Sequence, residues 1–369
     1  MKILQLGKFY PVRGGVEKVM YDLMLGLSAR GVDCDMMCAV TEGESRIETL
    51  NNHARLICCH TMVKAAATMI APNMIHTLRK MCHRYDIIHI HHPDPMACMA
   101  LYFSGYKGKV VLHWHSDILK QKHLLKLYRP FQNWLLQRAD LIVGTTPIYV
   151  KESPFLSDVQ HKITSFPIGT DPWDSHKGKP NYVRESYRDK KIIFSLGRLV
   201  EYKGYEYLID AAQYLPDDYV ILIGGTGPLR AKLQAQIDTA NLNEKVKLLG
   251  FVEDKDLPLY YDACSLFCLS SVFKTEAFGI VQIEAMSCSK PVIATSIPGS
   301  GTHWVNAHND SGLNVEPGNS EQMAKAILSI TENKEAYEAY CRNARARYEK
   351  LFTYEKMIDN CLEIYKRVL

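Results

Sequence analysis

The sequence lacks a regular arrangement of cysteines. Its eleven cysteines are an odd number, no Cys-x-x-Cys pair occurs, and the pairs Cys34/Cys38 and Cys264/Cys268 do not have the spacing of zinc ligands. Disulfide-stapled secreted domains and zinc modules depend on such spacings. We therefore expect free, mostly buried thiols in a reducing compartment.

Long apolar runs are also missing. The opening stretch MKILQLGKFYP is interrupted by Lys8, and the stretch AAATMIAPNMI contains Pro72 and Asn73. The first is too short for a signal peptide, and the second is too short to span a bilayer. We expect a cytoplasmic protein, and these patterns leave open a peripheral contact with the inner face of the cell membrane.

Charge of one sign is not in large excess, because the formal net charge is +4. Residues 1–178 contain 21 Lys and Arg against 15 Asp and Glu, whereas residues 179–369 contain 23 against 25. Neither half is basic enough to indicate nucleic-acid binding. A basic first half and a slightly acidic second half indicate two units with different partners.

What the sequence does contain is an alternation of β-rich runs and amphipathic helical segments that occurs twice. The first series includes KILQLG, VDCDMMCAV, YDIIHIH, KVVLHWH and DLIVGTT, and the second includes KIIFSLG, YVILIGG, KVKLLG, LFCLS and PVIAT. This pattern predicts an α/β fold of two Rossmann-like doubly wound domains with a cleft at the carboxyl ends of their strands. The expected ranges are a domain at 1–170, a linker rich in Pro and Gly at 171–190, a domain at 191–350, and a helix at 351–369 that packs back on the first domain.

Two glycine-rich loops follow predicted strands. Gly14 and Gly15 precede one helix, and Gly225 and Gly227 precede another. Glycines let a ligand approach the backbone, and a helix start offers amide groups to phosphate or sugar. A tight turn without ligand contact is the alternative interpretation. The second loop lacks the third glycine of a dinucleotide fingerprint, which disfavours a dehydrogenase.

Arg198 and Lys203 lie in the loop GRLVEYKG, directly after the first strand of the second series. A guanidinium and an ammonium held there would stabilise the charge that grows on a departing diphosphate. The alternative is a solvated pair of cations.

Two carboxylates frame the next candidate site. Glu276 lies just before a helix expected to begin near Phe278 or Gly279, and Glu284 lies about two turns inside that helix. Carboxylates accept hydrogen bonds from vicinal hydroxyls, and the amides of Phe278, Gly279 and Ile280 would be free at the helix start. The alternative interpretation is that Glu276 is stabilised only by the helix dipole and that Glu284 is exposed to solvent. A carboxylate in an apolar helix, however, needs partners.

Histidines gather at two other strand ends. His113 and His115 point to the same side of the strand KVVLHWH, and His115 stands at its carboxyl end. The alternative is a histidine whose ring nitrogens are hydrogen-bonded within the protein and contact no ligand. The stretch IHIHHPD, residues 88–94, resembles a metal site only superficially, because its proline indicates a rigid strand exit. We expect no metal ligands in the chain.

Together these motifs resemble the retaining GT-B glycosyltransferases of family four, also called glycosyl transferases group 1, of the bacterial surface-polysaccharide type. The resemblance covers nearly the whole chain. Its most specific part is EAFGIVQIEAMSCSKPVIAT, in which two glutamates are separated by seven residues. One part differs: residues 296–312 lack the acid that many relatives have after the PVIAT strand, so contacts made there cannot be carried over.

The resemblance implies roles for the residues named above. Glu276 would contact hydroxyls of the donor sugar, Glu284 would hold the ribose diol, and the diphosphate would lie at Arg198 and Lys203. The sugar would also contact His115 and the amides of Phe278, Gly279 and Ile280. The diphosphate would also contact Gly15. The base would contact Phe251 and Val252.

The implied reaction is transfer of a hexosyl unit from a UDP- or GDP-linked sugar to a saccharide acceptor, with retained anomeric configuration and without a cofactor or metal. The expected acceptor is lipid-linked. Two rival readings remain: a nucleotide-sugar epimerase of the same fold, and a non-catalytic protein that binds sugar nucleotides.

The acceptor is expected at the basic first half of the chain. Residues 107–138 contain seven Lys and Arg and one acid. In this segment Lys120, Lys122, Lys126 and Arg129 alternate with Leu124, Leu125, Leu127, Tyr128, Phe131 and Trp134. A basic segment with aromatic residues can lie on an anionic membrane. The alternative is a packed helix with a solvated basic face.

Overall fold

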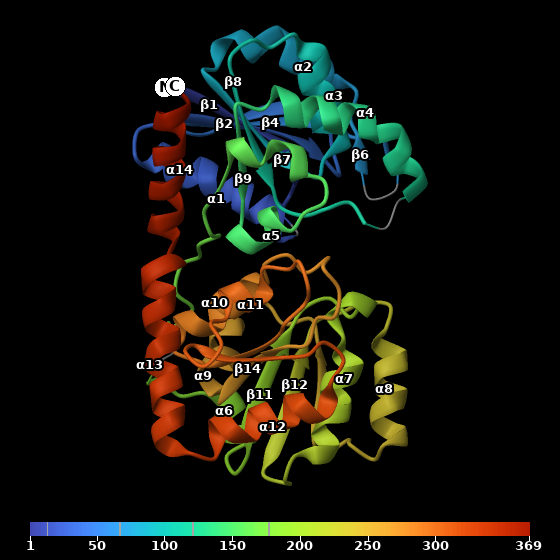
Figure 1. Cartoon of the computed structure of the whole chain (residues 1–369), viewed down its shortest axis with the longest axis vertical. Coiled ribbons are helices and arrows are strands. Elements are labelled where there is room, and N and C mark those ends of the chain that lie inside the picture. The colour runs from blue at the N-terminus through green and yellow to red at the C-terminus, as the bar shows by residue number, and fades with distance from the viewer. Residues whose placement is uncertain (13, 66–67, 120–121, 176–177) are drawn as a thin grey trace. The chain divides into compact units, whose positions relative to one another are not determined.

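The protein divides into two compact units in the computed structural model (Figure 1). Unit 1 comprises Met1–Ile168 together with Glu355–Leu369, and unit 2 comprises Gly169–Tyr354. The structure describes residues 1–12, 14–65, 68–119, 122–175 and 178–369. In these ranges no helix is both long and apolar enough to cross a membrane.

Unit 1 is built on an eight-stranded sheet with the order β10-β9-β8-β7-β1-β2-β4-β3. Its strands are β1 Lys2–Tyr10, β2 Asp33–Val40, β3 Arg46–Asn51, β4 Ala54–His60, β7 Ile87–His92, β8 Lys109–Trp114, β9 Leu141–Gly144 and β10 Ile163–Ser165. Neighbours pair in parallel except β3, which runs antiparallel to β4. The strand order reverses at β1, because the chain continues to β2 on one side and later returns to β7 on the other.

Helices cover this sheet, and their apolar residues explain the packing. In α1 the apolar residues Val19, Met20, Leu23, Met24 and Leu27 are fully buried, as the helical spacing predicts. The unit also contains a small hairpin. The bounds are α1 Gly15–Ala29, α2 Asn73–Met81, α3 Pro95–Ser104, α4 Lys122–Arg138, α5 Pro147–Lys151, the turns η1 Cys82–Arg84 and η2 Ser157–Lys162, and the hairpin β5 Val63–Ala65 with β6 Thr68–Ile70.

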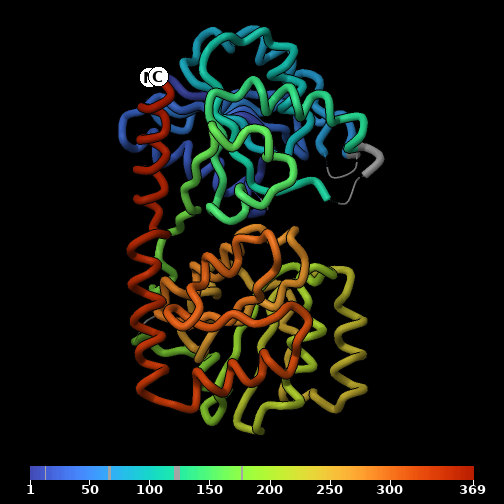
Figure 2. The backbone as a smooth tube through the Cα atoms, in the orientation of Figure 1, coloured from blue at the N-terminus to red at the C-terminus, as the bar shows by residue number. Residues whose placement is uncertain are grey.

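The last helix, α14 Tyr354–Val368, belongs to unit 1 from Glu355 onward. Figure 2 shows this red segment beside blue parts of the chain that are far away in sequence. The hydroxyl of Tyr365 accepts a 2.9 Å hydrogen bond from the Gln5 side chain and lies 2.6 Å from Nδ1 of His89. Arg30, at the end of α1, forms an ion pair with Asp359. The helix is therefore part of the core of unit 1.

Unit 2 has a six-stranded parallel sheet with the order β13-β12-β11-β14-β15-β16. Its strands are β11 Lys191–Leu196, β12 Tyr219–Gly224, β13 Val246–Gly250, β14 Leu266–Leu269, β15 Val292–Thr295 and β16 Gly312–Val315. The central strands β11, β12, β14 and β15 are mostly apolar and buried on both faces, as is typical of parallel sheets. The order reverses between β11 and β14, so this edge is the switch point where ligands of such sheets bind.

The helices of unit 2 are α6 Tyr182–Ser186, α7 Tyr205–Ala211, α8 Arg230–Thr239, α9 Leu257–Ala263, α10 Ile280–Ser287, α11 Thr302–Val305, α12 Ser320–Thr331 and α13 Lys334–Leu351, with turns η3 Glu201–Lys203 and η4 Ala212–Tyr214. The described part of the predicted linker 171–190 lies in this unit. There Asn181 caps α6 and donates a 2.8 Å hydrogen bond to the carbonyl of Leu259 in α9. Asn181 and Val183 are buried there, whereas most other described residues of the segment are exposed.

Candidate active site

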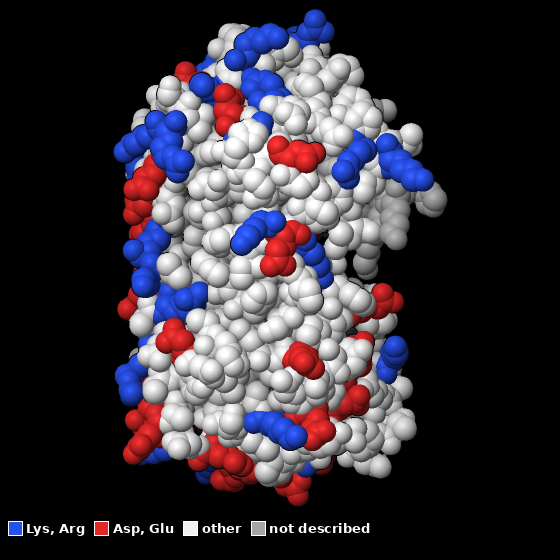
Figure 3. All heavy atoms as spheres, viewed as in Figure 1, with Lys and Arg blue, Asp and Glu red and all other residues white. Residues whose placement is uncertain are grey.

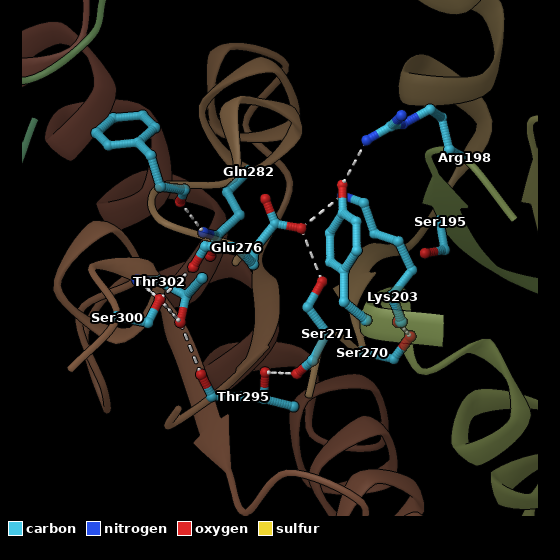
Figure 4. A network of polar contacts seen from close by, with 12 residues as sticks. Ser195, Arg198, Lys203, Ser270, Ser271, Glu276, Gln282, Thr295, Ser300 and Thr302 are labelled. Atoms are coloured by element: carbon cyan, nitrogen blue, oxygen red, sulfur yellow. Dashed lines mark hydrogen bonds and ion pairs between the residues drawn. The ribbon is translucent and has the colours of Figure 1, made fainter. Parts of the chain in front are cut away.

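The segments after β11 and β14 carry four of the predicted residues at the switch point of unit 2, and Figure 4 shows three of them, Arg198, Lys203 and Glu276. Arg198 and Lys203 follow β11, Glu276 follows β14, and Glu284 lies in α10. The structure thus assembles these side chains in one unit, at the sheet edge where the topology predicts a ligand.

Lys203 and Glu276 form a buried ion pair. The Lys203 ammonium donates to Oε2 of Glu276 at 2.6 Å, and the two side chains are only 10% and 11% exposed. Burial alone would lower the pKa of Lys203, but the Glu276 carboxylate outweighs it, and the pKa lies above its ordinary value. Ser271 donates to the same carboxylate oxygen at 2.8 Å. The pair is therefore a fixed charged centre, and among the described residues no hydrogen bond occupies Oε1, so this oxygen can accept from a ligand.

Arg198 is placed differently from Lys203. Its side chain is exposed, and its guanidinium donates one long hydrogen bond of 3.4 Å to the Tyr202 hydroxyl. Figure 4 shows the guanidinium on the Lys203 side of Glu276. The alternative of two solvated cations is therefore wrong for Lys203, whereas Arg198 is free to turn toward an anion.

The glycines of the loop after β12 pack against the loop after β11. A Cβ on Gly225 would come 1.9 Å from the carbonyl oxygen of Gly197, and one on Gly227 would come 2.4 Å from that of Leu199. The Leu199 amide donates to the carbonyl of Thr226 at 2.9 Å. Only glycine allows this close approach. These glycines thereby fix the loop that carries Arg198, and their predicted contact with the donor stays a prediction.

Helix α10 begins at Ile280, with Gly279 as its N-cap in a left-handed conformation (φ 76°). The first N–H groups of a helix have no partner within it, so the amides predicted to face the donor stand at this start. Gln282 turns back and donates to the carbonyl of Phe278 at 2.8 Å, which holds the turn closed.

Glu284 has the partner that its apolar surroundings demand. The hydroxyl of Tyr261 in α9 donates to its Oε2 at 2.6 Å, and both side chains are buried. Burial, and then the neighbouring carboxylate, raises the pKa of Tyr261. The Tyr261 hydroxyl therefore stays protonated, and its hydrogen bond orients Glu284.

Phe251 and Val252, predicted to lie near the base, follow β13. The Phe251 side chain is 74% exposed, and Val252 packs beside Gly224, whose added Cβ would lie 3.1 Å from a Val252 methyl. An exposed ring next to the sheet edge offers a stacking surface.

The predicted residues of unit 1 lie at the carboxyl ends of its own strands. Gly14 is the N-cap of α1 and Gly15 its first residue. His115 follows β8 and is buried, with Nε2 2.9 Å from Nδ1 of His91. Burial lowers the pKa of His115 well below its ordinary value.

The histidines of unit 1 form a stack. Among the described residues, nitrogens of His91, His113 and His115 lie within 4.8 Å of one another. The ring planes of His91 and His115 differ by 13°, and those of His113 and His115 by 19°. Nearly parallel rings do not aim their lone pairs at a common point, as metal coordination requires. This geometry favours mutual packing.

A pocket of about 80 Å³ lies at the strand-order reversal of unit 1. Lys8, Glu17 and Asp94 contribute its charged groups, and Phe9, Met69 and Pro95 are among its apolar lining. Asp94 accepts from the Lys8 amide at 2.5 Å and from the Ala97 amide at 3.0 Å. Burial raises the pKa of Asp94 and lowers that of Lys8. Charged groups beside apolar ones suit a polyhydroxylated ligand.

Sequence analysis missed three residues that shape the candidate site. Tyr261 holds Glu284, Ser271 holds the Glu276 side chain, and Ser300 donates to the Glu276 carbonyl at 2.5 Å. The only available signal was the strand end LSS for Ser271. The other two meet their partners through the tertiary fold.

Comparison with known proteins gives consistent matches. The family model "Glycosyl transferases group 1" matches residues 182–347, and "Glycosyltransferase Family 4" matches residues 13–172. The O-antigen chain mannosyltransferase C of Escherichia coli is 31% identical over 100% of this chain and 99% of its own length. The D-rhamnosyltransferase WbpZ of Pseudomonas aeruginosa is 30% identical over 96% of this chain and 92% of its own.

Solved structures match over the full chain at low identity. Anabaena HepE, in complex with UDP and glucose, has a TM-score of 0.78 at 22% identity, with 99% of each chain covered. Sucrose-phosphate synthase from Thermosynechococcus elongatus has a TM-score of 0.79 at 21% identity and covers 100% of this chain and 99% of its own. At these identities the similarity concerns the fold.

Proposed function

Because this chain belongs to the group 1 glycosyltransferases and has the GT-B fold, we propose that it transfers a hexosyl unit from a UDP- or GDP-linked sugar to a lipid-linked saccharide, with retained configuration, in cell-surface polysaccharide biosynthesis. The buried Lys203–Glu276 pair beside the exposed Arg198 carries the proposal. The relatives named for O-antigen mannosyl and D-rhamnosyl transfer support the choice of polysaccharide.

Several groups of unit 2 suit a nucleotide sugar and support the proposal. Glu284, oriented by Tyr261, has the carboxylate to accept two hydroxyls of a ribose. The amides at the start of α10 and the free oxygen of Glu276 suit hydroxyls of the sugar. The exposed ring of Phe251 suits a base.

The leaving diphosphate is the centre of the proposed chemistry. The acceptor oxygen forms a bond to the anomeric carbon on the face from which the diphosphate departs, the bond from that carbon to the phosphate oxygen breaks, and this phosphate oxygen takes the acceptor proton. Arg198 and Lys203 supply the positive charge that a metal supplies elsewhere. We therefore propose that no metal or cofactor takes part.

Glu276 is poorly suited to act as a nucleophile. One of its oxygens accepts from both Lys203 and Ser271, and these donors stabilise its charge and hold its position. Among the described residues, the other carboxylate of the site, Glu284, is bound by Tyr261 within α10. This arrangement supports front-face attack over the two-carboxylate route of retaining glycosidases.

The proposed place for the acceptor's hydroxyls is the pocket of unit 1. Its charged groups Lys8, Glu17 and Asp94 could accept and donate to hydroxyls, and Phe9 and Met69 could cover an apolar sugar face. The roles implied for Gly15 and His115 remain predictions.

Arg198→Ala tests the function. A panel of UDP- and GDP-sugars is first screened by thermal shift, and release of nucleoside diphosphate is then measured with polyprenyl-linked saccharides. Loss of one charge-stabilising donor should lower turnover at saturating donor by about 100-fold, on the order of 3 kcal/mol. The control Lys232→Ala, exposed on α8, should leave it unchanged.

Turnover of Arg198→Ala near the wild-type value would refute the proposed role. Conversion of the donor without any acceptor would identify an epimerase. Donor binding without release of nucleoside diphosphate would identify a non-catalytic binding protein. Lys203→Ala is a less specific test, because it leaves the buried Glu276 carboxylate unpaired, which typically costs about 3–5 kcal/mol of stability.

A further inference from the structure

A series of buried hydrogen bonds connects α14 with the carboxyl end of β8 in unit 1. The Gln5 amide nitrogen donates to the Tyr365 hydroxyl at 2.9 Å, and the Gln5 oxygen Oε1 lies 2.8 Å from Nε2 of His91. Nδ1 of His91 in turn lies 2.9 Å from Nε2 of His115. Gln5 and His91 are fully buried, and His115 is 3% exposed. We call Gln5, His91 and His115 the histidine network.

The orientation of the Gln5 amide decides the direction of these hydrogen bonds. Its nitrogen has two N–H donors, and it lies beside two acceptors, the Tyr365 hydroxyl at 2.9 Å and the Cys34 sulfur at 3.6 Å. With the amide reversed, both donors would face a single ring nitrogen of His91, so one buried N–H would have no partner among the described residues. An unpartnered buried donor is costly. The amide therefore keeps its oxygen toward His91.

The protonation of the two rings follows from this orientation. A carbonyl oxygen only accepts, so Nε2 of His91 carries the proton and its Nδ1 has a free lone pair. Burial lowers the pKa of His91 and of His115 well below the ordinary value, so each ring is neutral and has one proton. Nε2 of His115 must then donate to Nδ1 of His91. Nδ1 of His115 is thereby unprotonated and can only accept.

Helix α14 holds the other end of the histidine network. Its charged residues, among them Lys366 and Arg367, are exposed, and Figure 3 shows basic and acidic side chains where Figure 1 places this helix. Tyr365 lies on the opposite face of the helix and is fully buried beside Gln5 and His89. This amphipathic packing fixes the hydroxyl to which the Gln5 amide donates.

The ring of His115 is held in place from two sides. It stacks on His113, with the centroids 3.9 Å apart, and on His91, with the centroids 5.2 Å apart. Its backbone amide donates to the carbonyl of His92 at 3.1 Å. The ring therefore presents Nδ1 in a fixed direction.

Nδ1 of His115 has no hydrogen-bond partner in the part of the chain that the structure describes. In the basic segment that follows it, Lys120 lies outside the described residues, and so do the side chains of Lys122 and Leu124. Buried polar atoms normally have a partner. A fixed and unpartnered acceptor at the carboxyl end of a parallel strand therefore marks a place for a donor group of a ligand.

We propose that Gln5 and His91 are positioning residues that hold His115 in the tautomer with its proton on Nε2, and that the unprotonated Nδ1 accepts a hydrogen bond from a hydroxyl of the donor sugar. Gln5 and His91 do not themselves contact the substrate and act through His115. The inference deepens the proposed function and rests on it for the identity of the ligand. The tautomer itself is a property of the free chain.

The first test determines the tautomer in the full chain without ligand. Histidine is labelled with the heavy nitrogen isotope, and long-range proton–nitrogen correlation spectra distinguish a protonated ring nitrogen from an unprotonated one. The variant His115→Asn identifies the His115 signals by their absence. We expect the wild type to show a protonated Nε2 and an unprotonated Nδ1 on His115 near neutral pH. A protonated Nδ1 would overturn the proposal.

Two variants test whether the network sets this tautomer. Gln5→Met keeps the length of the side chain but has no carbonyl, and His91→Phe removes the acceptor for Nε2 of His115. Each should raise the share of His115 protonated on Nδ1 by about tenfold or more. An unchanged tautomer in both variants would contradict the role of Gln5 and His91.

His89→Phe is the matched control. His89 is as buried as His91, stacks on it at 4.7 Å and contacts Tyr365, but it is not part of the histidine network. The His115 signals should keep their wild-type pattern in this variant. Thermal melting checks that the variants fold, and the wild-type spectrum decides the tautomer without any of them.

The second test identifies what Nδ1 binds. It uses the UDP- or GDP-hexose that gives the largest thermal shift with the wild type, together with its monodeoxy analogues, each of which lacks one hydroxyl. His91→Phe should lower kcat/KM for the parent sugar by about five- to tenfold. It should leave kcat/KM unchanged for the analogue that lacks the hydroxyl bound by Nδ1. An equal loss with every analogue would indicate a merely structural role of His91 and overturn the assignment.

The two tests separate this inference from the proposed function. Turnover together with a protonated Nδ1 would refute the histidine network and leave the proposed function intact. An unprotonated Nδ1 in a chain that releases no nucleoside diphosphate from any donor would refute the proposed function and the assigned ligand, whereas the assigned tautomer would stand.

Discussion

At the scale of single residues, the site depends on buried partners that keep charged groups in place. Glu284 and Glu276 are both carboxylates, yet one is held by a tyrosine hydroxyl and the other by an ammonium and a serine. A neutral donor leaves a carboxylate its full charge for a ligand, whereas an ammonium partner offsets it. The two glutamates are therefore chemically distinct.

Tyr261→Phe tests the positioning of Glu284. The change removes a hydrogen bond to a charged group, worth about 1.5–3 kcal/mol, and weakens the hold on the Glu284 side chain. We expect the dissociation constant of the free nucleoside diphosphate, measured by calorimetry, to rise by about tenfold or more. The neighbouring Tyr260→Phe is the control. Equal effects in both variants would contradict a specific role of Tyr261.

The residue scale also shows where sequence reasoning stops. Glu276, Glu284 and Lys203 were found from their positions around a strand end and a helix start. The contacts that hold the two glutamates are not predictable in this way, because Tyr261 lies 23 residues from Glu284 and Lys203 lies 73 from Glu276. Such pairs are set by how β11, β14 and α9 pack, which no local pattern encodes.

At the scale of elements, the start of α10 is the most constrained feature of the site. Gly279 has a positive φ of 76°, and an added Cβ would lie 2.8 Å from the Gln282 amide and 2.8 Å from a Leu269 methyl. Both the backbone conformation and the space therefore require glycine.

Gly279→Ala should lower stability by about 1–3 kcal/mol and shift the amides that start α10. We expect a lower melting temperature and weaker donor binding in the same thermal-shift assay. Gly318→Ala is the matched control: its φ is 79°, but its nearest neighbour, the Tyr207 ring, is 3.5 Å away. Its melting temperature should fall less, and its donor binding should not change.

Most elements were predictable because each strand is a short apolar run closed by turn residues. The strands from KILQLG to PVIAT follow this rule. The helix at 354–368 was predictable from its amphipathic pattern instead. The antiparallel strand β3, Arg46–Asn51, was not predicted, because its residues are mostly exposed and polar. The composition of segment 171–190 predicts a linker, and within its described part Asn181 donates a hydrogen bond to the Leu259 carbonyl in α9.

At the scale of the whole molecule, the two units should respond differently to acid. Burial holds the pKa of His113 at about 3 and lowers those of His89, His91, His92 and His115. In the unfolded chain a histidine takes a proton near pH 6.5. Below that pH the unfolded state binds more protons, so the stability of unit 1 falls as the pH falls.

Each such histidine can cost up to about 1.4 kcal/mol per pH unit between its unfolded and folded pKa. Calorimetry at decreasing pH should therefore show unit 1 melting progressively earlier than unit 2. His113→Phe should reduce the slope by about that amount, because neither ring nitrogen of His113 has a hydrogen-bond partner in the described residues. The exposed His161→Gln is the control, and an unchanged slope in His113→Phe would contradict this account.

The position of α14 has a consequence for synthesis on the ribosome. Domains generally fold in the order in which they emerge, yet unit 1 is completed only when Tyr365 can reach Gln5 and His89. All of unit 2 has been translated by then. We therefore expect the nascent chain to carry a finished second unit while the first still lacks its last helix and exposes the residues that α14 covers.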